Sequence, residues 1–507
     1  MFVLKRLREL AKFDGTALIN GTESLSFSEM DERSENFGRF LRTRLNGDSS
    51  PILIYGHKET DFLPCIYGSL KAGHAYVPVD ISVPSERVRE IIEDISPKII
   101  VDFSRKLTAN AEIILPEDLT MILSSKYDVV ISESDWVEGE NTAYILFTSG
   151  SSGKPKGVPI TAQNLESFCV GLLKFMGNPG NGGVMLNQIS YSFDVSCCAV
   201  YVGMGLGMTL YTIDNAITSE PRVLFAHLRQ SGLTMWVSTP SFGELCMQYG
   251  AFDCELLSSL TDFLFCGEVL THKLCDQLFE RFPDSRICNT YGPTEATVLV
   301  TAVNVTADMR ADVRSIPIGY PIDGVTLRLI DGDGETVVED KVAGELLIIG
   351  DSVGTGYYRR SELTAERFFQ DKSTGKRGYR TGDICFRENG LYYYQGRIDN
   401  QLKLHGHRIE LEDIEQNLSR QENIVRAVVV PVWEEEKVSY LAAFVLLTEP
   451  DGLTPLKRSV AVKKKAAETL PDYMIPRKII AVESFPVNSN GKVDKKALSE
   501  SLRGTSR

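Results

Sequence analysis

Residues 144–157 read YILFTSGSSGKPKG, an apolar strand followed by ten residues of Ser, Thr, Gly, Lys and Pro. Such a loop suits a phosphate ligand, because glycines let backbone N–H groups approach an anion while hydroxyl and ammonium groups add donors and charge. The loop is not a Walker loop, since Pro155 stands where GxxxxGK[ST] requires its second glycine. The alternative is a flexible surface loop of the kind that Ser and Gly often form. The polar and glycine members of the loop are Thr148, Ser149, Gly150, Ser151, Ser152, Gly153, Lys154, Lys156 and Gly157.

The composition is typical of a soluble globular protein with two to four domains: 507 residues, 43% of them hydrophobic and 24% charged. The formal net charge is -14, but residues 400–507 contain 17 Lys and Arg against 15 Asp and Glu. This tail is therefore +2 and the preceding residues are -16. The acidic part disfavours nucleic acid as a partner, whereas the tail suits contact with an acidic protein.

Ten cysteines occur without a CxxC pair and without clustering near His. This distribution favours free thiols in a reducing cytoplasm and offers no metal ligand set. The N-terminus, MFVLKRLREL, has too short an apolar run for a signal peptide. Residues 195–213 are uncharged but include three glycines that weaken a helix, which predicts a buried core segment and no membrane insertion.

The order of patterns predicts an α/β protein with an added β module and a separate C-terminal domain. Helical patterns at 28–45 and 60–72 alternate with apolar strands at 51–55, 76–78 and 99–102, and a helix capped by Thr161 follows the loop. From about residue 316 the chain changes to short β segments with turn signals. After a candidate hinge at GRIDNQ, the tail alternates helix and strand, with a helix predicted at 459–470. The predicted division is 1–398 and 399–507.

Six motifs occur in one order: the Ser/Gly loop, NTYGPTEATV (289–298), GELLIIG (344–350), YRTGD (379–383), GRIDNQLKLHGHRIE (396–410) and NGKVDKKAL (490–498). With them the chain resembles the adenylate-forming enzyme superfamily, and it is similar to the amino-acid-activating branch. The segments LKAGHAYVPVDISVPSER, YSFDVS, FCGEVL and LPDYMIPRK resemble the D-alanine:D-alanyl carrier protein ligases.

The resemblance implies a large N-terminal domain of α/β subdomains with a small β-barrel-like module, and a small mobile α+β C-terminal domain. It implies ATP and Mg²⁺ as cofactors and two half-reactions. D-alanine first becomes D-alanyl-AMP, and the thiol of phosphopantetheine on a separate, small acidic carrier protein then takes the D-alanyl group. The product would serve D-alanylation of teichoic acids in the cell envelope by a cytoplasmic enzyme.

The resemblance also implies roles for individual residues. It assigns catalysis to Thr148, Glu295 and Lys492, with Glu295 binding Mg²⁺. Asp399 would be the hinge, and Gly406 would line the path of the pantetheine arm. The implied amino-acid pocket contains Asp194, Cys266 and Val298. The implied ATP site contains Thr148, Ser149, Gly150, Ser151, Ser152, Gly153, Lys154, Asn289, Tyr291, Gly292, Thr294, Asp383, Tyr394, Arg397 and Lys492.

The residue types suit these roles. A bound amino acid carries an ammonium that must be paired with a carboxylate, and Asp194 can supply one, although an aspartate there could equally be a helix N-cap. Asp383 can accept from ribose hydroxyls, or it is an ordinary turn aspartate. Lys492 is a solvated charge unless its NGK context is functional. Tyr392 and Tyr393 are interpreted as strand residues that cover the core.

Two other functions fit the pattern. One is a stand-alone adenylation enzyme for another small amino acid in non-ribosomal peptide synthesis. The other is a non-catalytic nucleotide-binding regulator, which predicts loss of Lys492 or Glu295. Both residues are present.

Overall fold

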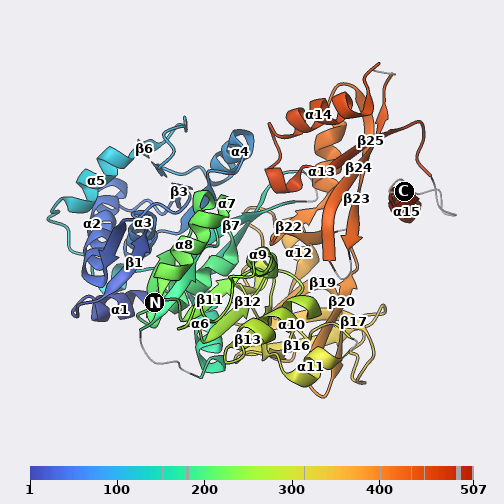
Figure 1. Cartoon of the computed structure of the whole chain (residues 1–507). Helices are drawn as coiled ribbons and strands as arrows, with labels where there is room; N and C mark the ends of the chain where they lie inside the picture. Colours follow the sequence, from blue (N-terminus) through green and yellow to red (C-terminus); the bar gives the residue numbers. More distant parts are fainter. Residues whose placement is uncertain are drawn as a thin grey trace. The chain divides into compact units, whose positions relative to one another are not determined.

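The computed structural model describes residues 1–150, 153–177, 182–312, 314–399, 401–434, 437–449, 452–486 and 493–504 (Figure 1). The chain forms two compact units. The body unit contains Met1–Ile81, Ile95–Phe147 and Gly157–Ile398, and the tail unit contains Ser82–Asp94, Thr148–Lys156 and Asp399–Arg507. The Ser/Gly loop therefore groups with the C-terminal residues. In the described residues, no helix has the length and apolar character needed to cross a membrane.

A nine-stranded sheet forms one half of the body unit, in the order β15-β14-β13-β12-β11-β9-β10-β1-β2. Its central strands run parallel from β1 to β13, and β2, β14 and β15 are antiparallel. Parallel strands place their carboxyl ends at one edge, where α/β proteins build sites. The strands are β1 (Thr16–Asn20), β2 (Glu23–Ser26), β9 (Val184–Asn187), β10 (Thr209–Thr212), β11 (Met235–Ser238), β12 (Asp262–Phe265), β13 (Arg286–Tyr291), β14 (Thr301–Asn304) and β15 (Tyr320–Pro321).

A second, six-stranded sheet has the order β6-β5-β3-β4-β7-β8. All five residues of β3 and of β4 are buried, as expected for central parallel strands that are covered on both faces. The predicted strands at 51–55, 76–78 and 99–102 all lie in this sheet. Its strands are β3 (Ile52–Gly56), β4 (Tyr76–Asp80), β5 (Ile99–Asp102), β6 (Glu112–Ile114), β7 (Thr142–Thr148) and β8 (Lys156–Thr161).

The predicted β module is a five-stranded antiparallel sheet in which β19 pairs with β17, β18 and β20. Tyr392 and Tyr393 of β20 are each 6% exposed, which confirms that they cover the core. The strands are β16 (Val325–Ile330), β17 (Gly344–Gly350), β18 (Phe368–Gln370), β19 (Arg377–Glu388) and β20 (Leu391–Arg397).

Local sequence signals explain where several helices begin. Helix α2 starts with a capping box in which Ser26 and Glu29 each bond the other's backbone N–H, and Thr161 caps α6 in the same manner with Asn164. The helices of the body unit are α1 (Phe2–Leu10), α2 (Phe27–Leu45), α3 (Phe62–Lys71), α5 (Pro116–Ser124), α6 (Ala162–Phe175), α7 (Asn215–Ser219), α8 (Pro221–Ser231), α9 (Pro240–Met247), α10 (His272–Arg281), α11 (Ala307–Ala311) and α12 (Ser361–Arg367), with short turns η1 (Glu133–Asp135), η2 (Asp194–Ser196) and η4 (Thr294–Ala296).

Residues 195–213 form a buried core segment, as predicted. Within it, Cys198–Gly203 is a π-helix, η3, which widens the helical turn. The hydroxyl of Tyr67 donates to the carbonyl of Val200 at 2.6 Å, and the hydroxyls of Tyr76 and Tyr201 lie 2.8 Å apart. Two tyrosines from α3 and β4 thus stabilise this irregular segment. All ten cysteines are free thiols, as predicted.

The tail unit contains a hairpin, a three-stranded sheet and helices packed on it. Helix α14 begins four residues before the predicted 459, because Thr454 caps it through the N–H of Lys457 and Pro455 occupies the first helical position. The elements are β21 (Gln401–Leu404), β22 (His407–Glu410), β23 (Ile424–Glu434), β24 (Lys437–Leu447), β25 (Lys478–Val482), α4 (Ser85–Ile95, up to Asp94 in this unit), α13 (Leu411–Ser419), η5 (Asp472–Met474), α14 (Pro455–Ala466) and α15 (Lys495–Gly504).

Candidate active site

Three residues predicted to bind the nucleotide are joined by hydrogen bonds: Tyr291 and Arg397 both donate to the carboxylate of Asp383. Asp383 on β19 is 5% exposed and accepts hydrogen bonds from the Tyr291 hydroxyl at the end of β13 and from the Arg397 guanidinium at the end of β20. Arg397 also donates to the carbonyl of Thr381 at 3.0 Å. Burial raises the pKa of the Tyr291 phenol well above its usual range, and the Asp383 charge adds to the rise. Tyr291 is therefore a neutral donor, and Asp383 is a fixed acceptor of the type that ribose hydroxyls require.

Asp194 lies at the start of η2, which follows β9 by a short loop, and it is 5% exposed. The hydroxyl of Thr294, at the start of η4 after β13, donates to Asp194 Oδ2 at 2.6 Å. A carboxylate predicted to bind an ammonium and a hydroxyl predicted to bind phosphate are thus in direct contact. Substrate carboxyl, ammonium and phosphate groups would have to lie close together here.

Glu295 is fully buried in η4, where the Tyr357 hydroxyl donates to its Oε1 at 2.7 Å. Within the described ranges, no group of three His, Cys, Asp or Glu side chains could hold a metal ion by itself. A single carboxylate still fits Mg²⁺, because this ion is often held by one or two carboxylates together with phosphate oxygens. Tyr357 was not predicted from the sequence, because its contact with Glu295 joins positions 62 residues apart.

The backbone after Glu295 is strained. Thr297 and Val298 have φ of 62° and 69°, a left-handed conformation that β-branched residues rarely adopt. The Thr297 hydroxyl donates to the carbonyl of Ser352 at 2.6 Å, and a Cβ on Gly292 would stand 2.5 Å from Leu299 Cα. These contacts fix the turn that carries Thr294 and Glu295. The sequence contains no signal for it.

The predicted pocket residues Cys266 and Val298 are each 1% exposed. Cys266 follows β12, and its thiol lies 3.9 Å from the carbonyl oxygen of Val298. The next residue, Gly267, has φ of 98°, so a side chain there would be strained. The strained turn and the end of β12 therefore form one wall.

Asn289 and Tyr394 are the predicted adenine residues. Asn289 is 3% exposed and donates its side-chain amide to the carbonyl of Pro317 at 2.8 Å. The carbonyl of Tyr394 accepts from Ser315 at 3.2 Å. Both contacts anchor the segment before β15, so Asn289 shapes this part of the body unit through a structural hydrogen bond.

The described part of the Ser/Gly loop has the character of an anion site. Among the described residues, the Thr148 hydroxyl is buried and has no hydrogen-bond partner, which leaves it able to donate to a phosphate oxygen. Ser149 donates to the carbonyl of Arg408 at 2.9 Å, and Lys156 lies 3.5 Å from Glu410. Lys154 is exposed. Ser151, Ser152 and Lys492 lie outside the described residues.

Three further predicted residues, Gly150, Asp399 and Gly406, lie in turns. Gly150 accepts from the N–H of Gly153, which has φ of 74° and would place a Cβ 2.9 Å from Gln416. Asp399 accepts from the N–H of Gln401 at 3.3 Å. Gly406 has φ of 82° in the turn between β21 and β22, which suits glycine.

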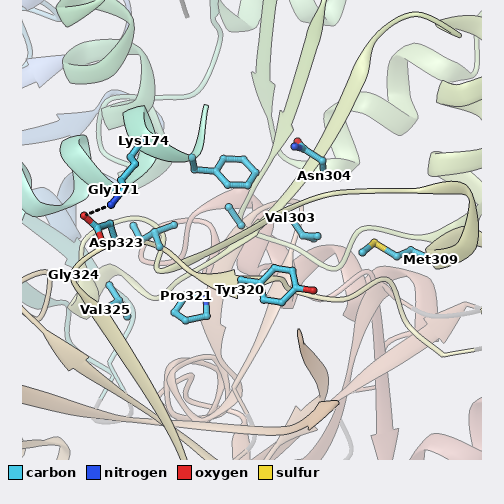
Figure 2. A pocket seen from close by; sticks show the side chains of 13 residues that line it. Gly171, Lys174, Val303, Asn304, Met309, Tyr320, Pro321, Asp323, Gly324 and Val325 are labelled. Carbon is cyan, nitrogen blue, oxygen red and sulfur yellow. Dashed lines mark ion pairs between the residues drawn. The ribbon is translucent and has the colours of Figure 1, made fainter. Parts of the chain in front are cut away.

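A groove of about 670 Å³ in the body unit contains none of the predicted site residues. Figure 2 shows its side chains from α6 and from the β14 and β15 region, with an ion pair of 3.1 Å between Lys174 and Asp323. The candidate site is therefore the cluster around Asp194, Thr294, Glu295 and Asp383.

Two sequence profiles of known domain families match this chain. The sequence profile of the AMP-binding enzymes matches residues 8–358, and that of the AMP-binding enzyme C-terminal domain matches residues 413–492. The chain is 39% identical over 501 residues to the D-alanine--D-alanyl carrier protein ligase of Bacillus anthracis, covering 98% of this chain and 99% of the relative. A ligase of the same name from Bacillus cereus is also 39% identical, over 502 residues.

Solved structures show the same fold. The Vibrio cholerae adenylation domain AlmE, in complex with glycyl-adenosine-5'-phosphate, has a TM-score of 0.84 at 23% identity and covers 99% of this chain and 97% of its own. Holo-PA1221, an NRPS protein containing adenylation and PCP domains, has a TM-score of 0.83 at 24% identity, covering 98% of this chain and 83% of its own. By the sequence profiles and the near full-length relatives, this chain belongs to the AMP-binding enzyme family.

Proposed function

We propose that the protein activates D-alanine with ATP and transfers the D-alanyl group to the phosphopantetheine thiol of a separate carrier protein, for D-alanylation of teichoic acids. The observation that carries the proposal is the 2.6 Å contact between Thr294 and Asp194. It joins a phosphate-binding hydroxyl to a buried carboxylate, as an enzyme that adenylates an amino acid requires. The names of the Bacillus relatives support D-alanine as the amino acid.

In the first half-reaction, the carboxylate of D-alanine attacks the α-phosphorus of ATP. A C–O–P linkage forms, the bond to the β-phosphate breaks, and pyrophosphate leaves. Asp383 holds the ribose, Thr148 donates to a phosphate oxygen, and Lys492 adds positive charge where oxygens gain negative charge. The Thr294 hydroxyl, which donates to Asp194 in the free protein, turns to a phosphate oxygen when the substrate ammonium takes its place at Asp194. Mg²⁺ bound by Glu295 would neutralise charge on the phosphate groups.

In the second half-reaction, the phosphopantetheine thiol loses its proton and attacks the carbonyl carbon of D-alanyl-AMP. A thioester forms, and AMP leaves with the bonding electrons. Asp399 is the hinge at which the C-terminal domain turns between the two steps, and Gly406 leaves space for the pantetheine arm.

Selectivity for D-alanine follows from pinning two substituents of its α-carbon. Asp194 fixes the ammonium and the phosphate site fixes the carboxylate, so the methyl group faces one of two walls. The wall formed by Cys266 and Val298 is buried and closely packed. It would exclude the methyl group of L-alanine and admit that of D-alanine.

The test is exchange of labelled pyrophosphate into ATP, measured with D-alanine, L-alanine, glycine and serine. Exchange that depends on D-alanine above the other three is the expected result. Preference for another amino acid would contradict D-alanine as the substrate and would favour the alternative, an adenylation enzyme for non-ribosomal peptide synthesis. Asp194→Asn is the matched variant, because it keeps the size and removes the charge; we expect it to lose about 100-fold in kcat/KM for D-alanine, as when a buried charge pair is broken. An unchanged kcat/KM would remove Asp194 from the ammonium site.

A further inference from the structure

The loop that presents Asp194 rests on a buried polar cluster in the body unit. We call residues 187–194 the Asp194 loop. It begins at the end of β9, and the side-chain amide of Asn187 donates to the Tyr191 hydroxyl at 2.8 Å, which closes the loop on itself. The N–H of Phe193 donates to the carbonyl of Ser190 at 3.0 Å. The loop's internal bonds thus define its shape but leave its position to outside contacts.

The first outside contact passes through Asp80, the last residue of β4. His57 Nδ1 lies 2.6 Å from Asp80 Oδ2, and the hydroxyl of Ser190 donates to the same oxygen at 2.6 Å. Asp80 is 4% exposed and His57 is 9% exposed. A buried carboxylate therefore ties the middle of the Asp194 loop to the turn that follows β3.

The second contact is made by Lys58 in that same turn. Its ammonium donates to Asn187 Oδ1 at 2.7 Å and lies 3.7 Å from the centre of the Tyr191 ring. Tyr191 also packs against Phe62 of α3, with ring centres 4.8 Å apart. Lys58 therefore contacts both Asn187 and Tyr191, the two residues whose hydrogen bond closes the loop.

Burying Lys58 is costly, because an ammonium loses its hydration and regains little from neutral partners. Lys58 is 4% exposed, and burial lowers its pKa well below the ordinary value, while the Asp80 charge acts in the opposite direction. An apolar side chain of the same length would fill the space at lower cost. What an apolar residue could not do is hold Asn187 Oδ1 and the face of Tyr191.

We infer that His57, Lys58 and Asp80 are positioning residues for amino-acid binding, which hold the Asp194 loop where Asp194 meets Thr294. The inference rests on the proposed function only in taking Asp194 as the ammonium site. His57, Lys58 and Asp80 are not catalytic, because they act on Asp194 only through the loop. The loop residues that Lys58 and Asp80 contact precede Asp194 by three to seven positions. Loss of these contacts would weaken amino-acid binding and leave the ribose site of Tyr291, Asp383 and Arg397 on β13, β19 and β20 unaffected.

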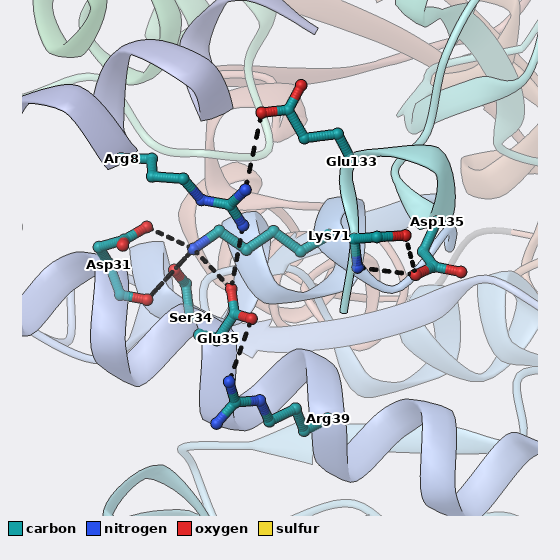
Figure 3. Close-up of polar contacts among 9 residues, drawn as sticks. Arg8, Asp31, Ser34, Glu35, Arg39, Lys71, Glu133 and Asp135 are labelled. Carbon is teal, nitrogen blue, oxygen red and sulfur yellow. Dashed lines mark hydrogen bonds and ion pairs between the residues drawn. The ribbon is translucent and has the colours of Figure 1, made fainter. Parts of the chain in front are cut away.

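The test compares two buried lysines of the body unit. Lys71 is fully buried and donates to Asp31 Oδ1 at 2.6 Å and to Ser34 at 2.8 Å (Figure 3). Its cluster joins α2 and α3 and makes no contact with the Asp194 loop among the described interactions. Lys58→Met and Lys71→Met each remove one buried ammonium and keep the side-chain length. A thermal unfolding transition measured for each variant checks that it is folded.

Of the two lysine variants, only Lys58→Met should change the binding of D-alanine. We expect its KM for D-alanine in pyrophosphate exchange to rise about 10-fold, the effect of losing one hydrogen bond to a charged group, with the KM for ATP unchanged. Lys71→Met should keep both constants. Ser190→Ala, which removes a single hydroxyl, should shift the D-alanine KM in the same direction even if the lysine variant folds poorly. Equal changes in both KM values, or the same pattern in Lys71→Met, would overturn the inference.

Hydrogen exchange of the free protein separates this inference from the proposed function. Amides of residues 188–197 should exchange faster in Lys58→Met than in the parent and in Lys71→Met. Unchanged protection would show that the loop keeps its position without Lys58. This measurement needs no substrate, so it decides the inference even if the wild-type enzyme activates another amino acid or shows no exchange of pyrophosphate.

Discussion

At the scale of single residues, one thiol is proposed to set the stereochemistry. Cys266 is packed against the carbonyl of Val298. Cys266→Ala should raise turnover of L-alanine far more than turnover of D-alanine, because it removes the thiol from the wall that excludes the L-methyl group. The parent should prefer D-alanine by about 1 to 3 kcal/mol, the discrimination that one methyl group gives in a pocket. The D/L ratio of kcat/KM in pyrophosphate exchange measures this. A variant that keeps the parent ratio would show that the selective wall lies elsewhere.

The residues of the site differ in how far they could be predicted from sequence. The motifs predicted Tyr291, Asp383 and Arg397, and the structure brings these three together. The contacts of Lys58 with Asn187 and of Ser190 with Asp80 join positions 129 and 110 residues apart, and no local pattern encodes them. The left-handed Thr297 and Val298 contradict local preference, so tertiary contacts alone hold them.

At the scale of elements, the turn between β18 and β19 depends on one carboxylate. Asp371 accepts from the hydroxyls of Ser373 and Thr374 and from Arg328, and these donors hold the pKa of Asp371 well below its usual range. Because the folded-state pKa is depressed, the stabilisation is complete above the unfolded pKa and disappears as pH falls through the folded value. Asp371→Asn should lower the unfolding temperature by a few degrees at pH 7.

The pH series is the control for that prediction. The difference in unfolding temperature between Asp371→Asn and the parent should shrink as the pH falls below about 4, where the unfolded carboxyl becomes protonated. A difference that is constant with pH would mean that the side-chain charge plays no part in the turn.

Elements with strong local signals were predicted well, and those shaped by the core were not. The helical pattern predicted at 28–45 agrees with α2 almost to the residue, and the capping box of Ser26 and Glu29 explains where the helix starts. The helix predicted at 459–470 starts four residues too late, because Thr454 caps α14 and Pro455 occupies its first position. The π-helix η3 depends on hydroxyls of Tyr67 and Tyr76 that arrive from distant elements, so its extra residue per turn has no signature in its own sequence.

At the scale of the whole molecule, two variants should separate the half-reactions. Lys492→Ala should lose about 100-fold or more in adenylation, the size typical of removing a transition-state charge contact, and should keep transfer from preformed D-alanyl-AMP. Gly406→Leu should do the opposite, because its side chain would obstruct the pantetheine path and strain a backbone with φ of 82°. Single-turnover assays of each half-reaction measure both effects. Equal losses in the two assays would place the residue in a shared structural role.

The charge distribution bears on the carrier partner. The tail is +2 and the preceding residues are -16. Helix α14 adds exposed Lys457 and Lys464 beside the exposed apolar residues Leu456 and Val460. An acidic carrier should bind near this helix, so the KM for carrier should rise several-fold between about 50 and 300 mM salt, with the KM for D-alanine unchanged.

A pair of charge reversals makes the carrier prediction specific. Lys457→Glu/Lys464→Glu should raise the KM for carrier and flatten its salt dependence. Lys12→Glu/Lys106→Glu changes the net charge equally through exposed lysines of the body unit and should have little effect. Equal effects of the two double variants would mean that only the total charge matters.

The pairing of β1 with β10 means that β1 must wait during synthesis of the chain until its partner strand has been made. Thr16 and Thr209, which are joined by a hydrogen bond of 2.7 Å, are 193 residues apart, so β1 leaves the ribosome long before its parallel neighbour exists. At ribosomal rates of about 5 to 20 residues per second, the wait is roughly 10 to 40 s. During that interval the β1–β2 hairpin offers an open strand edge to the crowded interior of the cell. The six-stranded sheet, whose strands end by Thr161, can be complete before then, and the rest of the nine-stranded sheet pairs with the free edge of β1 afterwards.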